Sequence, residues 1–150
     1  MSQALAKIYL HLVFFTKNRD PLLPDDIRVD LHSYMGGILN GLGCLPIEIN
    51  SEPDHVHLLF VMARTETVSN VVGQLKKCSN DWLRRRDQQF RNFYWQGGYG
   101  AFSVSQSGVE EVRFYIRDQR THHKQTSFQD EYRAFLKRYE IEFDERYVWD

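Results

Sequence analysis

The sequence lacks the features that mark several classes of protein. It has only two cysteines, Cys44 and Cys78, which cannot form a dense disulfide framework, so a reducing compartment is the expected setting. No apolar run approaches the length of a membrane-spanning helix, and the N-terminus lacks the basic-then-apolar layout of a signal peptide. It also contains no internal repeat or low-complexity tract. We therefore expect a cytoplasmic protein with no membrane partner.

The chain also lacks a strong excess of charge of either sign. Its net charge is −1, and its 42% hydrophobic and 26% charged residues are ordinary for a globular protein. A length of 150 residues suits a single domain over residues 1–150. Residues 61–124 nevertheless hold 11 Lys and Arg against 6 Asp and Glu. This basic middle section would suit an anionic partner that the net charge conceals.

Hydrophobic periodicity divides the chain into alternating strands and helices. Their order is strand, helix, strand, strand, helix, strand, followed by two more helices. This is the order of the ferredoxin-like split βαβ fold, an α+β fold with a four-stranded antiparallel sheet and helices on one face, here with additional C-terminal helices. The first and third strands form its central pair. The expected strands are residues 7–15, 45–51, 55–62 and 101–105, and the expected helices are residues 25–40, 67–86, 107–124 and 128–139.

Two histidines stand at the head of the third expected strand, in the segment Glu52-Pro-Asp-His-Val-His-Leu-Leu. Side chains alternate along a strand, so His55 and His57 point to the same face. Two imidazoles in this arrangement can bind one metal ion if another element supplies a further ligand. We expect the open face of the sheet to present both rings. The alternative is a buried strand whose two histidines have ordinary hydrogen-bond partners.

The third expected helix begins at Ser107, with Glu110 completing a capping box, and carries Tyr115 and Gln119 four residues apart. Residues at this spacing share one face of a helix, so a phenol and an amide would lie side by side. The alternative is a tyrosine at the edge of a core-facing helix. The chain has eight tyrosines, and periodicity alone does not select one of them.

These segments together resemble a known family. The histidine segment, Tyr115-Ile-x-x-Gln, Trp95-Gln-x-Gly-Tyr-Gly-x-Phe-Ser-Val-Ser and Thr16-Lys-Asn-Arg are similar to motifs of the single-tyrosine HUH transposases of short insertion sequences, the IS200-like transposase family. The resemblance extends from the first strand to the helix at residues 128–136. It implies a ferredoxin-like fold, in agreement with the strand order.

The resemblance also implies roles for individual residues. His55, His57 and Gln119 would bind Mg²⁺ or Mn²⁺, and Tyr115 would attack a phosphodiester of single-stranded DNA. The products would be a 5′-phosphotyrosine and a free 3′-hydroxyl, followed by strand transfer. The partners would be single-stranded DNA hairpins and a second copy of the chain, with Tyr115 of one subunit serving the histidines of the other. We expect no small-molecule substrate.

Basic and aromatic side chains supply candidate DNA contacts. Lysines and arginines would neutralise phosphates, and exposed aromatic rings would stack on unpaired bases. Within the aromatic stretch Phe93–Tyr99, core packing is the favoured role of Phe93 and Trp95. A second set of cations forms a stripe roughly opposite Tyr115 and would either bind flanking DNA or form a solvated face. The DNA-binding candidates are Lys76, Lys77, Arg84, Arg85, Arg86, Arg91 and Tyr99, and the stripe is Arg113, Arg117, Arg120 and Lys124.

Other functions stay open at this point. The chain could be a domesticated or inactive module that binds hairpin DNA or RNA, or an HUH nuclease of the replication-initiator type. A two-histidine phosphoesterase would need a second His-x-Thr/Ser motif, which the sequence lacks. No helix-turn-helix is evident, so single-stranded or hairpin DNA is the expected substrate. His11 has no assigned role, and a solvated helix end is favoured for His122 and His123.

Overall fold

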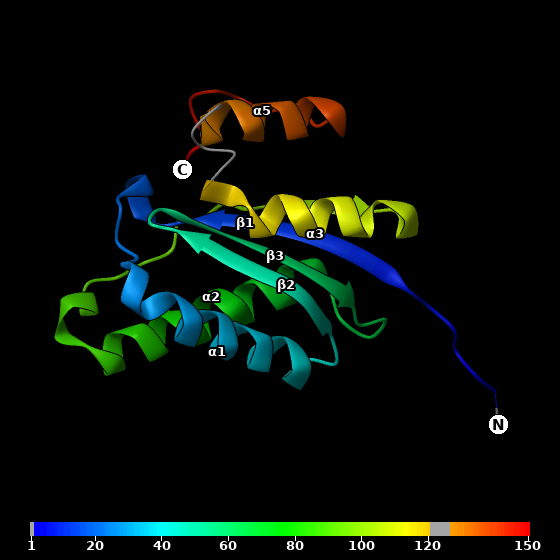
Figure 1. The fold of residues 1–150 in the computed structure, drawn as a ribbon, viewed down its shortest axis with the longest axis horizontal. Helices are drawn as coiled ribbons and strands as arrows, with labels where there is room; N and C mark the ends of the chain where they lie inside the picture. Colours follow the sequence, from blue (N-terminus) through cyan, green and yellow to red (C-terminus); the bar gives the residue numbers. More distant parts are fainter. Residues whose placement is uncertain (1, 121–126) are drawn as a thin grey trace.

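A computed structural model, which describes residues 2–120 and 127–150, contains a four-stranded antiparallel sheet with strand order β2-β3-β1-β4 (Figure 1). The two central strands are β1 and β3, which confirms the expected order. The strands are β1 (Ile8–Phe15), β2 (Leu45–Glu52), β3 (His55–Met62) and β4 (Gly100–Val104). Their bounds lie within one residue of those expected from the sequence.

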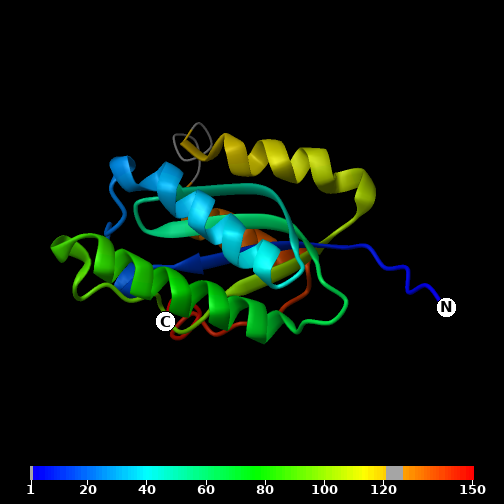
Figure 2. The same ribbon diagram turned by 90° about the horizontal axis from the view of Figure 1, so that it is seen from below.

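Helices cover both faces of this sheet (Figures 1 and 2). Helices α1 and α2 lie side by side on one face, and α3 and α5 lie on the other. The described helices are α1 (Arg28–Gly41), α2 (Val68–Arg86), α3 (Val109–Arg117) and α5 (Phe128–Arg138). Single 3-10 turns are found at Lys17–Arg19, Asp25–Ile27, Gln88–Phe90 and Gln106–Gly108.

Alternation along the central strands produces two hydrophobic clusters. Leu12, Phe14 and Leu58 belong to the larger one, where the sheet packs against α1 and α2. Val13 and Phe15 belong to the smaller one, where the sheet packs against α5. The first face is therefore a predominantly apolar core. The second mixes apolar side chains with the buried histidines of β1 and β3.

The third helix differs from its prediction at both ends. It begins at Val109 after a 3-10 turn, with Gly108 at its N-cap and no side-chain capping bond, so the predicted capping box is wrong. The Ser107 hydroxyl instead lies 3.3 Å from the hydroxyl of Ser105. The helix ends at Arg117, because Asp118 has non-helical backbone angles (φ −100°, ψ 28°). His122, His123 and Lys124 lie outside the described residues.

The C-terminal region packs against the second face of the sheet. The backbone N–H of Asp130 donates to the Ser127 hydroxyl, which caps the N-terminus of α5. After α5, the chain returns so that Val148 and Trp149 pack against the smaller cluster. No helix within residues 2–120 and 127–150 is both long and apolar enough to cross a bilayer.

A buried serine joins α2 to the aromatic segment before β4, and its loss should be measurable. The Ser79 hydroxyl donates to the Leu75 carbonyl (2.5 Å) and accepts from the Trp95 indole N–H (2.8 Å). Ser79→Ala should lower the free energy of unfolding by about 1–3 kcal/mol, because the buried indole N–H loses its acceptor. Chemical denaturation measures this change. Ser69→Ala, at an exposed position of the same helix, is the control and should stay within about 0.5 kcal/mol; equal losses in both variants would contradict the assignment.

Candidate active site

Three histidines gather on the sheet face that α3 and α5 cover. In the register of the central strands, Val13 pairs with His57 and Phe15 with His55, so His11, His55 and His57 share one face. The rings of His55 and His57 have centroids 5.1 Å apart, and those of His57 and His11 are 5.2 Å apart. The predicted pairing of His55 and His57 on one face is confirmed, and His11 joins them from the neighbouring strand.

Each of the two motif histidines has its Nδ1 atom engaged. His57 Nδ1 shares a hydrogen bond of 2.9 Å with His11 Nε2. Burial lowers the pKa of His11 to about 4, so this ring is neutral at physiological pH. His55 Nδ1 lies 2.6 Å from the Asp54 carboxylate. A metal bound to this pair would therefore be held through Nε2 of each ring.

Arg19 connects the turn after β1 to this network. Its guanidinium donates to Asp54 Oδ2 (3.1 Å) and lies over the rings of Phe128 and Trp149. Burial disfavours the Asp54 carboxylate, but its hydrogen bonds to His55 and Arg19 outweigh burial and lower its pKa. The charged carboxylate keeps the proton of His55 on Nδ1, the arrangement common behind metal-binding histidines. Asn18 and Arg19 both adopt left-handed backbone angles (φ 57° and 58°) to make this turn.

The expectation that the histidine face is open is wrong. His55 is 1% exposed and His57 is 0% exposed. The Phe128 ring at the start of α5 stacks on His55 with centroids 3.8 Å apart. The physical reason is the second hydrophobic cluster, because the apolar side chains beside the histidines pack against α5.

Tyr115 lies in the same cluster of rings. Its ring centroid is 5.8 Å from that of His57 and 6.4 Å from that of His11. Its hydroxyl donates to Glu131 Oε2 of α5 (2.6 Å). Burial, together with this hydrogen bond, raises the pKa of the phenol well above its usual value. The structure thus brings Tyr115 next to the histidines of its own chain, with a carboxylate on its hydroxyl.

An asparagine of β2 fixes the helix that carries Tyr115. The Asn50 amide donates to the carbonyl of Ile116 (2.7 Å) in the last turn of α3, and its oxygen accepts from Arg28 of α1 (2.5 Å). Ile116 is fully buried. The C-terminal end of α3, where carbonyls lack helical partners, is thus tied to the sheet.

Gln119 follows Tyr115 at the end of the described part of this region. It is fully buried, and its Nε2 donates to the Tyr115 carbonyl (3.1 Å). Its Oε1 is buried and has no hydrogen-bond partner among the described residues. In the same part of the chain, no three His, Cys, Asp or Glu side chains are grouped so that they could hold a metal ion. A site here would combine the histidine pair with another type of ligand, such as the Gln119 amide.

Comparison with known proteins identifies the family. The family model described as "Transposase IS200 like" matches residues 4–119, which include the histidine pair, Tyr115 and Gln119. The chain belongs to this transposase family. No curated protein matches it.

Solved structures show the same fold. A protein assigned as a transposase, from Deinococcus radiodurans R1, is 23% identical with a TM-score of 0.61, over 79% of this chain and 98% of that one. A REP-associated tyrosine transposase, solved bound to a REP hairpin, is 16% identical with a TM-score of 0.55, over 82% of this chain and 74% of that one. The ferredoxin-like architecture expected from the strand order is that of these transposases.

Several of the candidate DNA contacts of the transposase make internal contacts. The Lys76 ammonium donates to the carbonyls of Gln96 (2.6 Å), Gly97 (3.3 Å) and Gly98 (2.8 Å), and burial lowers its pKa to about 8. Arg84 donates to the Phe93 carbonyl and lies 4.1 Å from the Tyr94 ring centroid. Arg86 donates to the Asp30 carboxylate (2.5 Å). Lys77, Arg85, Arg91 and Tyr99 have exposed side chains.

The described arginines of the stripe, on α3 and just after it, make ion pairs within the chain. Arg113 and Arg117 lie 3.5 Å and 3.0 Å from the Glu48 carboxylate of β2, and Arg120 pairs with Asp25. The sequence alone suggests flanking DNA or solvent as the surroundings of the stripe, and neither includes these ion pairs. The pairs attach the α3 region to β2 and to the turn before α1. The contacts are exposed, so each contributes little to stability.

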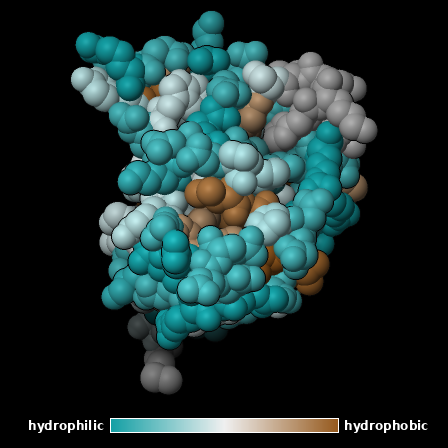
Figure 3. Space-filling view, turned by 90° about the vertical axis from the view of Figure 1, so that its left-hand side faces the viewer, coloured by the Kyte–Doolittle hydropathy of each residue, from teal (hydrophilic) through white to brown (hydrophobic). Residues whose placement is uncertain are grey.

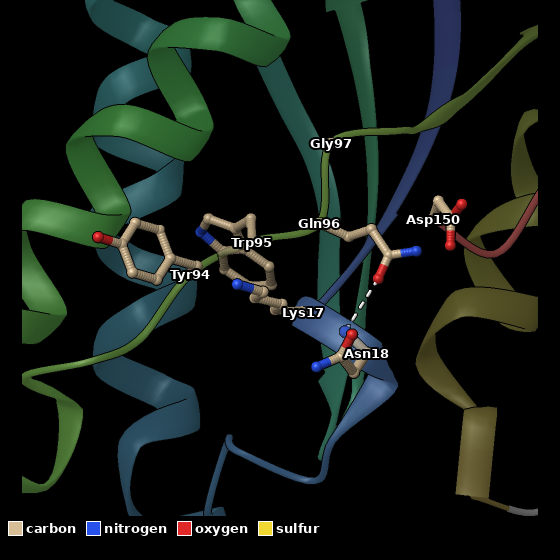
Figure 4. A pocket seen from close by; sticks show the side chains of 7 residues that line it. All are labelled: Lys17, Asn18, Tyr94, Trp95, Gln96, Gly97 and Asp150. Carbon is tan, nitrogen blue, oxygen red and sulfur yellow. Dashed lines mark hydrogen bonds between the residues drawn. The ribbon is translucent and has the colours of Figure 1, made fainter. Parts of the chain in front are cut away.

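Two motifs of the family resemblance meet at a pocket of about 300 Å³ (Figure 4). The turn after β1 supplies Lys17 and Asn18, and the segment before β4 supplies Tyr94, Trp95 and Gln96. Gln96 Oε1 accepts from the Asn18 backbone N–H (3.0 Å), and Figure 4 shows its side chain between Asn18 and Asp150. Phe93 and Trp95 are 3% and 7% exposed, which confirms their predicted core role.

The surface at one end of the molecule is mostly hydrophilic. Figure 3 views the end on the left of Figure 1 and shows a hydrophobic patch near its centre and smaller hydrophobic areas toward its edges.

Sequence reasoning gave no role to four residues that shape this site: Arg19, Asn50, Phe128 and Glu131. The sequence predicted residues 128–139 only as a helix, without a role in the site for Phe128 or Glu131. Nothing local in the sequence shows that this helix packs over the histidines.

The neighbouring lysines of α2 offer a test that separates structural from DNA-binding cations. Lys76→Met should lower the free energy of unfolding by about 1–3 kcal/mol, because three carbonyls lose a charged donor. Lys77→Met should leave stability within about 0.5 kcal/mol. If Lys77 contacts a phosphate, its loss should reduce the slope of log affinity for single-stranded DNA against log salt by about 0.7. Denaturation and salt-dependent binding measure these effects. An unchanged slope would remove Lys77 from the interface.

Proposed function

We propose that the chain is a metal-dependent transposase that cleaves and rejoins single-stranded DNA through Tyr115. The observation that carries the proposal is the packing of Tyr115 against His57, 5.8 Å between ring centroids, inside the segment that matches the transposase family. A tyrosine beside a histidine pair, with the Gln119 amide bonded to the tyrosine's carbonyl, offers a nucleophile and a set of metal ligands. The hairpin bound in a structure of similar fold supports hairpin DNA as the substrate.

The residues present fit a divalent metal. The Gln119 Oε1 atom is buried and takes no hydrogen bond from the described residues, and the Asp54 carboxylate orients His55. Two imidazoles and an amide oxygen suit Mg²⁺ or Mn²⁺ better than the closed tetrahedral set of a structural zinc. His55, His57 and Gln119 would hold the ion. When bound, it would polarise the scissile phosphate and neutralise its developing charge.

The chain's own residues then account for the covalent chemistry. The Tyr115 oxygen forms a bond to the phosphorus while the bond from phosphorus to the 3′-oxygen breaks. The product is a 5′-phosphotyrosine and a strand that ends in a 3′-hydroxyl. Because the phosphotyrosine is itself a phosphodiester, a 3′-hydroxyl of another strand can attack it and restore Tyr115. Strand transfer therefore needs no external energy source.

The first test separates the nucleophile from other tyrosines. Tyr115→Phe should bind a single-stranded hairpin substrate but form no covalent adduct, because the attacking oxygen is gone. Mass spectrometry of the wild-type adduct should place the nucleotide on Tyr115. Tyr139→Phe, which loses only a hydrogen bond to the Ser103 carbonyl, is the control and should cleave normally. Adducts on another tyrosine, or equal cleavage of a perfect duplex, would refute the proposal.

A second test addresses the metal ligands. His57→Gln should lower cleavage by about 100-fold or more and weaken Mn²⁺ binding measured by calorimetry. Gln is preferable to Ala, because His57 is fully buried and Ala would leave a cavity. Gln119→Ala should have a smaller effect, since water can replace an amide ligand. His32→Gln, which loses a contact with Ser51 outside the site, is the control. Full activity and Mn²⁺ affinity in a folded His57→Gln protein would rule out this ligand.

A third test concerns the homodimer. The family resemblance implies a site shared between two subunits, whereas the contact between Tyr115 and His57 of one chain supports a site within each subunit. Mixed dimers of Tyr115→Phe and His57→Gln chains, tagged differently, distinguish the two. From the observed contact we expect no cleavage, because every site would carry one defect. Cleavage restored at one site per mixed dimer would instead establish the shared arrangement.

A further inference from the structure

We propose that Glu131 is a catalytic residue that takes the phenol proton of Tyr115 when this oxygen attacks DNA. The proposal rests on the proposed function, because it assigns a role within the same reaction. Its starting observation is the hydrogen bond of 2.6 Å from the Tyr115 hydroxyl to Glu131 Oε2. The acceptor is thus already on the reacting atom, at the distance that a general base requires.

Packing, rather than a loose surface contact, places this carboxylate. Phe128, Tyr132 and Leu136 of α5 are buried in the smaller cluster, against Phe15 and its neighbours on the sheet. Glu131 lies in the first turn of α5, after the Ser127 cap. The backbone N–H groups at a helix N-terminus favour a nearby negative charge.

A glycine in β4 permits this close docking. A Cβ atom at Gly100 would lie only 2.6 Å from the Tyr132 hydroxyl, so a larger residue there would displace α5. The position of Glu131 relative to Tyr115 therefore depends on contacts that the sheet itself provides.

The chemistry needs such an acceptor. A free phenol has a pKa near 10, so the neutral hydroxyl is a weak nucleophile at physiological pH. In the forward step the O–H bond of Tyr115 breaks and its proton moves to Glu131. The phenol oxygen bonds to phosphorus, and the departing 3′-oxygen takes a proton from water. In the reverse step the attacking 3′-hydroxyl gives up its proton to water, and protonated Glu131 returns a proton to the tyrosine oxygen.

The Tyr115–Glu131 pair is accessible from the surface. Both side chains line a pocket of about 210 Å³ that is also bounded by Ala134, Phe135 and Arg138. The Arg138 side chain is exposed and provides a positive charge beside the pair. A phosphate could thus approach Tyr115 without crossing the apolar cluster. The pocket also has room for a small carboxylic acid.

Glu131 lies outside the segment that matches the family model, which ends at residue 119. Its role is inferred from the structure of α5 and does not follow from the family assignment.

Three variants test the proposal under single-turnover conditions with a hairpin substrate. Glu131→Gln should bind the hairpin with an affinity within about twofold of wild type. It should cleave the hairpin at least about 100-fold more slowly, because general base catalysis usually contributes at least that factor. Asp130→Asn is the matched control, because it makes the same change one residue away, where the carboxylate contacts Arg133. It should cleave at the wild-type rate. Glu131→Ala should be inactive alone and regain cleavage when formate is added, whereas formate should not rescue Tyr115→Phe.

The alternative outcomes are distinct. Wild-type cleavage by Glu131→Gln would show that this carboxylate is not the base. Faster cleavage would show that it holds the tyrosine in a resting position, which also overturns the proposal. A Glu131→Ala protein that binds the hairpin but is not rescued by formate would assign the carboxylate a purely structural role. If wild type forms no adduct with any hairpin, the proposed function fails, not merely the role of Glu131.

Discussion

The candidate site depends on the alternation of side chains along the two central strands. One set of alternate positions forms a continuous apolar face for α1 and α2, and this larger cluster supports the sheet. The other set contains His11, His55 and His57. Because the first face alone provides most of the core, the second can carry polar groups and bury them under α3 and α5. The histidines therefore belong to a rigid sheet, while their covering residues come from separate helices.

Much of this architecture could be predicted because it depends on short-range patterns. Alternating apolar residues and turn signals placed every strand within one residue of its observed bounds, and strand order followed from element order. The histidine pair could be placed on one face for the same reason. Tyr115 and Gln119 could be selected as site residues only through the family resemblance, because hydrophobic periodicity does not single out one of the eight tyrosines. The fold and family are confirmed; the roles of the site residues remain predictions.

Contacts between distant segments set the limits of prediction. The burial of the histidines depends on Phe128, which lies more than 70 residues away along the chain. Lys76 and Arg84 carry the positive charge expected of DNA-binding residues. Both nevertheless donate hydrogen bonds to backbone carbonyls of the segment before β4. Every residue has a backbone carbonyl, so the sequence does not indicate which carbonyls accept these hydrogen bonds. The same applies to Asn50, whose position on an edge strand gives no sign that it holds the end of α3.

Arg19 shows how the geometry of a candidate active site can oppose the stability of the protein that carries it. Left-handed backbone angles cost about 1–2 kcal/mol for a residue with a side chain, and glycine avoids most of this cost. Arg19 adopts such angles and places its guanidinium on Asp54 and over Phe128. Selection for thermal stability alone would therefore favour glycine here, at the expense of the charge network behind His55. A laboratory search for heat-resistant variants would therefore be drawn toward glycine at this position.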